Sequence, residues 1–152
     1  IVIDDLREMA NDPFEWQGVG TEFIDSSDVE DLRQITNTNF DLTKVIRFCD
    51  EINGSFNAGY YLATALLIRA LINHIPPVFG YETFKQVVSQ STKSRKELSR
   101  PLEEIARDVA DLHSHDTIRK KEHLPTKRQL EPFKPNIEIL LQEIITELKP
   151  VE

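Results

Sequence analysis

Three of the four histidines lie in one polar stretch of the chain, within and just after residues 111–116, which read DLHSHD. A metal ion could use His113, His115 and a carboxylate, but residues two apart on a helix do not face each other, and helical metal pairs are spaced by three or four. Imidazolium groups near a helix C-terminus instead interact favourably with the helix dipole and with free carbonyls. We therefore expect no metal and no cofactor. The stretch is a candidate binding patch, formed by His115, Arg119, Lys120, Lys121 and His123.

Arg69 is the one charged residue well inside the most apolar segment of the chain. An unpaired guanidinium in an apolar interior carries a large desolvation penalty, so we expect Arg69 to be a structural buried charge paired with Asp108 or Asp111. Cys49 falls on an apolar helical seam, which indicates a packed small side chain rather than a nucleophile. As the only cysteine it also excludes an internal disulfide.

The net charge of −8 is unevenly distributed along the chain. Residues 1–60 carry a balance of −9, residues 61–130 carry +4, and the rest carry −3. The global charge argues against generic nucleic-acid binding, which needs clustered Lys and Arg. A local basic region at 93–128 leaves RNA as a possible partner.

The first half of the chain shows helical periodicity. Ser26-Ser27-Asp28 is a capping cluster, and residues 27–53 fit either one long helix or two helices that meet near Asn39-Phe40-Asp41, with a turn at Asn53-Gly54. Ser55 would cap a following helix that is apolar on nearly every face, which is typical of a buried central helix. Pro76-Pro77 ends it. Tyr81, Phe84, Val87 and Val88 indicate a short helix after Gly80.

The second half contains two further apolar stripes. The first is the seam of an amphipathic helix capped by Ser99 and consists of Leu98, Leu102, Ile105, Val109 and Leu112. Residues 117–134 resemble a basic connecting loop, and Pro135 begins the last helix. No segment alternates like a strand. The sequence predicts an all-α fold, a helical bundle of four to six helices around a central buried helix at about 56–75. The expected shared core is Leu62, Leu66, Ile105, Val109, Leu141 and Ile144.

Residues 27–150 should form a single helical domain, because a chain of 152 residues is of one-domain size. Residues 1–26 lack periodicity and fit an extended N-terminal arm or a linker remnant, anchored by Phe14, Trp16 and Phe23. The chain starts without Met, which suggests that it was cut from something longer. No run of about 18 apolar residues exists, so we expect no membrane span, no membrane contact and a cytoplasmic location.

One short segment carries a family resemblance. Residues 57–72 read NAGYYLATALLIRALI, an aromatic pair followed by small residues and then Leu-Leu-x-Arg-Ala-Leu. This is similar to the central helix of HEPN-like bacterial domains, which are all-α bundles of toxin–antitoxin, abortive-infection and other defence proteins. The resemblance covers about 16 residues in detail and extends loosely over the flanking helices.

The resemblance implies a possible activity. Active members are metal-independent ribonucleases with an Arg-x(4–6)-His motif, in which the Arg stabilises charge on the phosphate and the His moves the proton of the 2′-hydroxyl. Arg107 with His113 fits this spacing, and so does Arg69 with His74. A chain this rich in Arg and His matches such spacings by chance, and in active members the motif opens the last helix, whereas Arg107 falls inside the expected penultimate one.

We therefore expect a non-catalytic interaction or oligomerisation module, an accessory domain of a larger bacterial defence-type protein. Its expected partner is another protein or a second copy of the chain. Phe14, Trp16 and Phe23 offer apolar surface for a homodimer. The alternative is a metal-independent HEPN-type ribonuclease that uses Arg107 and His113.

Overall fold

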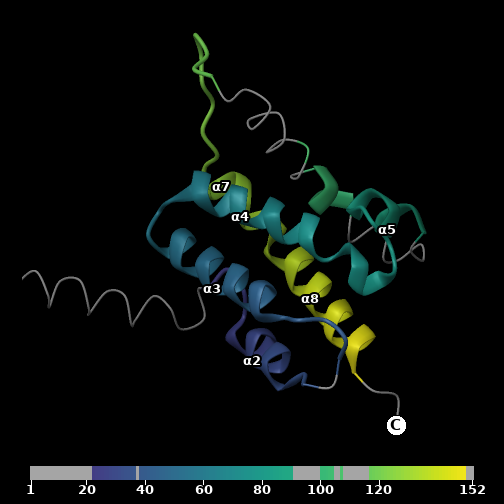
Figure 1. Ribbon diagram of the computed structural model, residues 1–152. Helices are drawn as coiled ribbons and strands as arrows, with labels where there is room; N and C mark the ends of the chain where they lie inside the picture. Colours follow the sequence, from purple (N-terminus) through teal and green to yellow (C-terminus); the bar gives the residue numbers. More distant parts are fainter. Residues whose placement is uncertain (1–21, 37, 91–99, 105–106, 108–116, 150–152) are drawn as a thin grey trace, which may run out of the picture.

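The computed structural model describes residues 22–36, 38–90, 100–104, 107 and 117–149, and the regular structure of these residues is helical, without a strand (Figure 1). The all-α prediction is confirmed. The elements are α2 (Ser26–Gln34), α3 (Thr43–Asn57), α4 (Tyr61–His74), η1 (Pro76–Phe79), α5 (Phe84–Gln90), α7 (Lys127–Leu130), η2 (Glu131–Phe133) and α8 (Lys134–Leu148). Residues 100–104 are also helical, at the start of the predicted penultimate helix.

Residues 27–53 fold as two helices rather than one, which was one of the two predicted alternatives. Asp25 caps α2 by accepting the backbone N–H of Ser27 at 2.8 Å, and this bond lowers the pKa of Asp25 below its ordinary value. The poor helix formers after Gln34 separate α2 from α3. Asp41 then accepts the Thr43 N–H at 2.9 Å where α3 begins.

The turn between α3 and α4 lies five residues later than predicted. α3 continues through Asn53 and Gly54 and ends at Asn57. Gly59, with φ of 80°, occupies the left-handed conformation that glycine adopts without strain, so the chain turns there. Ser55 is therefore inside α3 and does not cap the next helix. Its hydroxyl instead shares a 2.8 Å hydrogen bond with that of Thr64 in α4.

The fully buried residues of α4 lie on one face and most of its other residues are half-buried, so the predicted burial of this helix on all sides is not confirmed. Its buried residues are Thr64, Ala65, Ile68, Leu71 and Ile72. Leu66 of the predicted core is half-buried and Leu62 is 43% exposed, while Leu141 and Ile144 are buried as predicted. Ile105 and Val109 lie outside the described residues. Since all faces of α4 are apolar, the pattern could not indicate which face packs inward.

The α4–η1 stretch, Tyr61–Phe79, is apolar and long enough to cross a membrane by length and composition, with a mean hydropathy of 1.4. The expectation that no segment meets this criterion is therefore too strict. Core helices pass the same test, but here only 39% of the window is buried. The other residues of α4 are half-buried along the middle of the helix and exposed at its two ends, at Leu62, Ala63, Asn73 and His74.

α8 completes the core by packing against α2 and η1 (Figure 1). It begins at Lys134, one residue before the predicted Pro135. The predicted loop at 117–134 is only partly a loop, because α7 and η2 lie within it. Thr126 and Gln129 form a capping box at α7, each side chain satisfying the backbone N–H of the other residue. Residues 117–126, green in Figure 1, project away from the helices.

Candidate interaction surface

The predicted catalytic pair is only half described. Arg107 is exposed, and its guanidinium lies 2.9 Å from a carboxylate oxygen of Glu103, one helical turn earlier. His113 and His115 lie outside the described residues. The second pair with this spacing, Arg69 and His74, is described. The ring of His74 packs edge-on against Phe48, and partial burial, followed by the charge of Lys44, lowers the pKa of His74.

The rest of the predicted binding patch lies on the projecting loop. Lys120, Lys121 and His123 are exposed there, and Arg119 is half-buried, with its backbone N–H 2.6 Å from a carboxylate oxygen of Glu122. Ile118 on the same loop is 94% exposed. The described part of the predicted patch therefore lies on one loop, and beside it is an exposed aliphatic side chain, Ile118, that was not predicted from the sequence.

Arg69 is half-buried, and its predicted role as a paired buried charge stays a prediction. It forms no ion pair with a described residue, and the partners proposed for it, Asp108 and Asp111, lie outside the described ranges. Its long side chain can reach water from α4. Cys49 is fully buried, and this burial raises the pKa of its thiol to about 12. The burial confirms that Cys49 is a packed side chain. A thiol with so high a pKa also provides almost no nucleophilic thiolate. No described group of His, Cys, Asp and Glu could hold a metal ion.

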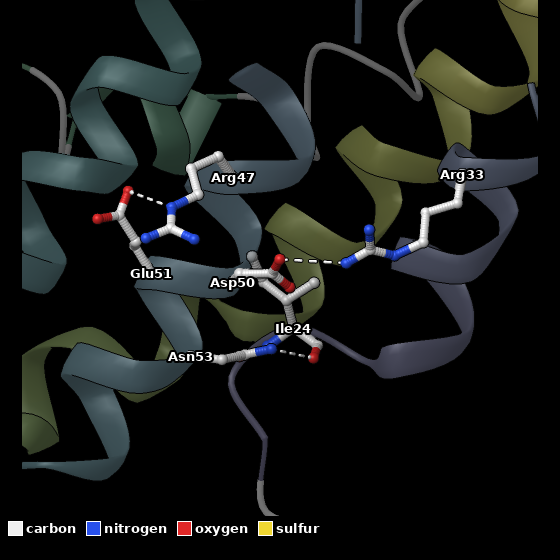
Figure 2. A network of polar contacts seen from close by, with 6 residues as sticks. All are labelled: Ile24, Arg33, Arg47, Asp50, Glu51 and Asn53. Atoms are coloured by element: carbon white, nitrogen blue, oxygen red, sulfur yellow. Dashed lines mark hydrogen bonds and ion pairs between the residues drawn. The ribbon is translucent and has the colours of Figure 1, made fainter. Parts of the chain in front are cut away.

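Asn53 holds the N-terminal segment onto α3, a role that the sequence analysis missed. Its side-chain carbonyl accepts the N–H of Ile24 at 2.7 Å, and its amide donates to the carbonyl of Ile24 at 2.9 Å (Figure 2). The side chain thus pairs with the backbone of Ile24 as a neighbouring strand would. The adjacent Phe23 is 3% exposed and packs on Phe56 with ring centroids 4.8 Å apart. Phe23 is an anchor as predicted, but because it is buried it does not offer the predicted surface for a homodimer; Phe14 and Trp16 lie outside the described residues.

Two ion pairs lie side by side on α3 (Figure 2). Arg33 of α2 lies 3.1 Å from Asp50 and links the two helices, while Arg47 lies 3.6 Å from Glu51 within α3. All four side chains are about half exposed or more. Exposed pairs of this kind contribute little to folding, on the order of 0–1 kcal/mol. Their charges therefore remain available for contacts with other molecules.

An open groove of about 460 Å³ runs between α3 and α4. At one end it is bordered by Arg47, Asp50 and Glu51, and at the other by Tyr60. Its remaining lining consists of small residues and one large aliphatic side chain: Gly54, Ser55, Ala58, Ala63 and Leu67. Tyr60 is 68% exposed, and the neighbouring Leu62 adds further apolar surface. An apolar hollow with charges at its border is typical of an interaction surface.

A carboxylate is enclosed between α2 and α8. Asp28 is 5% exposed, and its Oδ2 atom has no hydrogen-bond partner. Burial raises the pKa of Asp28, the negative charges of Glu138, Asp25 and Asp31 add to the rise, and a hydrogen bond with Gln142 opposes it. Asp25 rather than Asp28 caps α2, and Asp28 is a buried carboxylate whose charged form is unfavourable.

Comparison of the chain with family models, with curated proteins and with solved structures finds no match.

Proposed function

We propose that this chain is a non-catalytic interaction module that self-associates through the exposed apolar start of α4 and the groove beside it. The observation that carries the proposal is the mismatch between the composition of α4 and its burial. The helix is apolar on all faces, yet Tyr60, Leu62 and Ala63 are exposed at its start. Such a face is stabilised when a partner covers it.

The exposed apolar side chains of this face offer part of the free energy that association requires. Burying a large apolar side chain contributes about 1.5–3 kcal/mol, and aromatic residues at the centre of an interface contribute most. Tyr60 and Leu62 both offer such surface, and in a two-fold dimer these two side chains would be buried on both copies. This gain must exceed the loss of translational and rotational freedom on association.

The larger protein to which this module belongs, its location and its contact with RNA are inferred from the sequence. The resemblance of residues 57–72 to HEPN-like domains supports a place within a larger bacterial defence-type protein in the cytoplasm. RNA contact through 93–128 stays a prediction. For the ribonuclease alternative no described contact favours catalysis, since the one described member of the pair, Arg107, is engaged by Glu103.

Light scattering coupled to size exclusion tests the proposal. One chain has a mass of 17.5 kDa, and at tens of micromolar the parent protein should have twice this mass. Leu62→Lys should shift the protein to the monomer, because a lysine ammonium would be desolvated in the interface. Phe40→Lys is the matched control, since Phe40 is exposed to a similar extent but lies between α2 and α3. A monomeric parent, or a dimer equally unaffected by both changes, would contradict the proposal.

A further inference from the structure

The groove has two ends of different chemistry with a hollow between them. On α3, Arg47, Glu51, Gly54 and Ala58 are spaced by four, three and four residues, so they form one stripe along the helix. Arg47 and Glu51 border one end of the groove, and Tyr60 borders the other, next to Ala58. Gly54 lies between these ends, about two helical turns from Arg47.

Gly54 leaves the middle of this stripe open. No heavy atom lies within 4 Å of the position that a Cβ would take there, so the fold itself has room for a side chain. Glycine also weakens a helix by about 0.5–1 kcal/mol relative to alanine. Gly54 is not needed for a turn either, because α3 continues to Asn57 and the left-handed residue is Gly59. What Gly54 does provide is close access to the backbone of α3.

The two ends of the groove complement each other. The electron-rich face of a tyrosine ring attracts a guanidinium, and a phenol hydroxyl donates well to a carboxylate. Tyr60 is prominent at one end, while Arg47 and Glu51 at the other end have side chains 71% and 48% exposed. Within one chain Tyr60 and Arg47 border opposite ends of the groove. If a second copy is related by a two-fold axis through the middle of the groove, Tyr60 of each copy meets Arg47 of the other.

We propose that the groove is occupied by a second copy of this chain, related by a two-fold axis that passes close to Gly54. Tyr60 of each copy lies against Arg47 and Glu51 of the other, and the two α3 helices cross at their Gly54 positions. This inference rests on the proposed function, because it specifies the partner and the arrangement of the self-associating face. A two-fold interface uses the same patch on both subunits, and this patch contains both halves of the contact.

A cysteine at the axis tests the arrangement, because a residue on a two-fold axis faces its own copy. Gly54→Cys should form an intermolecular disulfide under mild oxidation, since the two Cα atoms would lie within the roughly 7 Å that a disulfide spans. The native Cys49 is buried and should not cross-link. Phe40→Cys, exposed but away from the groove, is the control and should stay largely monomeric on a non-reducing gel.

Charges at the same position give an independent readout. Gly54→Asp and Gly54→Lys should each be monomeric by light scattering, because like charges would meet at the axis, whereas an equimolar mixture should form a heterodimer. Circular dichroism checks that both variants are helical. At the end of the groove, Tyr60→Ala should raise the dimer dissociation constant by about tenfold or more, whereas Tyr60→Phe, which keeps the ring face, should raise it less.

The outcomes separate this inference from the proposed function. If Leu62→Lys disrupts the dimer while Gly54→Cys fails to cross-link and the mixed charge variants do not pair, the chain self-associates in another arrangement and only this inference is overturned. If the parent chain is monomeric, the proposed function is overturned as well. Cross-linking at Gly54 together with pairing of the opposite charges would support both.

Discussion

The residues on the two sides of α3 have the same helical spacing, but one side is buried and the other is exposed. On the inner side, Val45, Cys49, Ile52 and Phe56 are spaced by four, three and four residues, and all are buried. On the outer side, Arg47, Glu51, Gly54 and Ala58 repeat the same spacing two residues later, and all are exposed. The helical spacing therefore indicates only which residues share a face, and it does not indicate whether that face is buried. Side-chain type decides which face the chain covers itself and which remains for another molecule.

The comparison extends to polar groups. On the inner side Asn53 satisfies both backbone groups of Ile24 and so joins the N-terminal segment to the helix. On the outer side the Arg47–Glu51 pair is exposed and joins no other element. The inner contact contributes to folding, whereas the outer pair contributes little until a partner excludes water from it. The predictions below use this difference.

The largest expected effect contrasts two aliphatic residues of α4. Ile68→Ala should lower the free energy of unfolding by about 3 kcal/mol, because Ile68 is fully buried and its removal leaves a cavity. Leu62→Ala should lower it by less than about 0.5 kcal/mol at concentrations where the chain is monomeric. Urea unfolding followed by circular dichroism measures both. Equal losses would show that α4 is buried on both faces, as the sequence alone suggested.

The second effect concerns Asn53. Asn53→Ala leaves the N–H and carbonyl of Ile24 without their partners, so it should lower the free energy of unfolding by about 2 kcal/mol. Asn73→Ala, at an exposed position near the end of α4, is the control and should change little. Amide exchange at Ile24 should also accelerate in the Asn53 variant alone. Unchanged exchange at Ile24 would show that the segment is held by Phe23 rather than by the amide of Asn53.

The third effect depends on pH and lies between α2 and α8. The pKa of Asp28 is raised above its ordinary value of 3.8, so the folded chain binds this proton more tightly than the unfolded chain does. Ionised Asp28 therefore destabilises the fold at neutral pH, and this cost decreases as the pH falls through the raised pKa and disappears below about 3.8.

Asp28→Asn removes this titration. It should raise the free energy of unfolding by about 1 kcal/mol at pH 7, and the difference from the parent should vanish toward pH 4. Asp31→Asn on the exposed side of α2 is the control and should change stability little across this range. If Asp28→Asn is less stable than the parent at pH 7, the carboxylate makes favourable contacts that outweigh its burial.

The sequence was sufficient to predict the helical class, because long stretches of period 3.6 with proline and glycine between them exclude strands. It also identified the break at Pro76-Pro77 and gave a break near Asn39 as one of two alternatives, because backbone chemistry limits the helix locally at both places. The turn predicted at Asn53-Gly54 was wrong, because the sequence does not distinguish a glycine inside a helix from a glycine at a turn. Only the positive φ of Gly59 distinguishes the two.

The candidate surface was harder to predict than the fold. The residues predicted from the sequence carry charge or imidazole, and of these Lys120, Lys121 and His123 are exposed on one loop. The middle of the groove is lined instead by small residues, of which Gly54 was assigned to a turn, while Tyr60 and Ala63 at its side were assigned to a buried helix. Burial depends on which face of α4 meets α3, and an all-apolar helix does not encode that choice in its periodicity. The apolar surplus on α4 was the available signal, and it was assigned to the core.

The smallest expected change in stability, at Gly54, separates folding from association. Gly54→Ala places a methyl group where no heavy atom lies within 4 Å, so the monomer accommodates it without a clash. Alanine is also the better helix former, and the free energy of unfolding of the monomer should rise by about 0.5 kcal/mol. If α3 helices cross at Gly54, two added methyl groups meet at the axis and the dimer dissociation constant should rise severalfold. Sedimentation velocity over a range of concentrations and urea unfolding at low concentration measure these two quantities separately. Opposite changes in the two quantities show that the outer side of α3 serves association, and a Gly54→Ala chain that is stabilised with no change in dissociation constant would place the contact elsewhere.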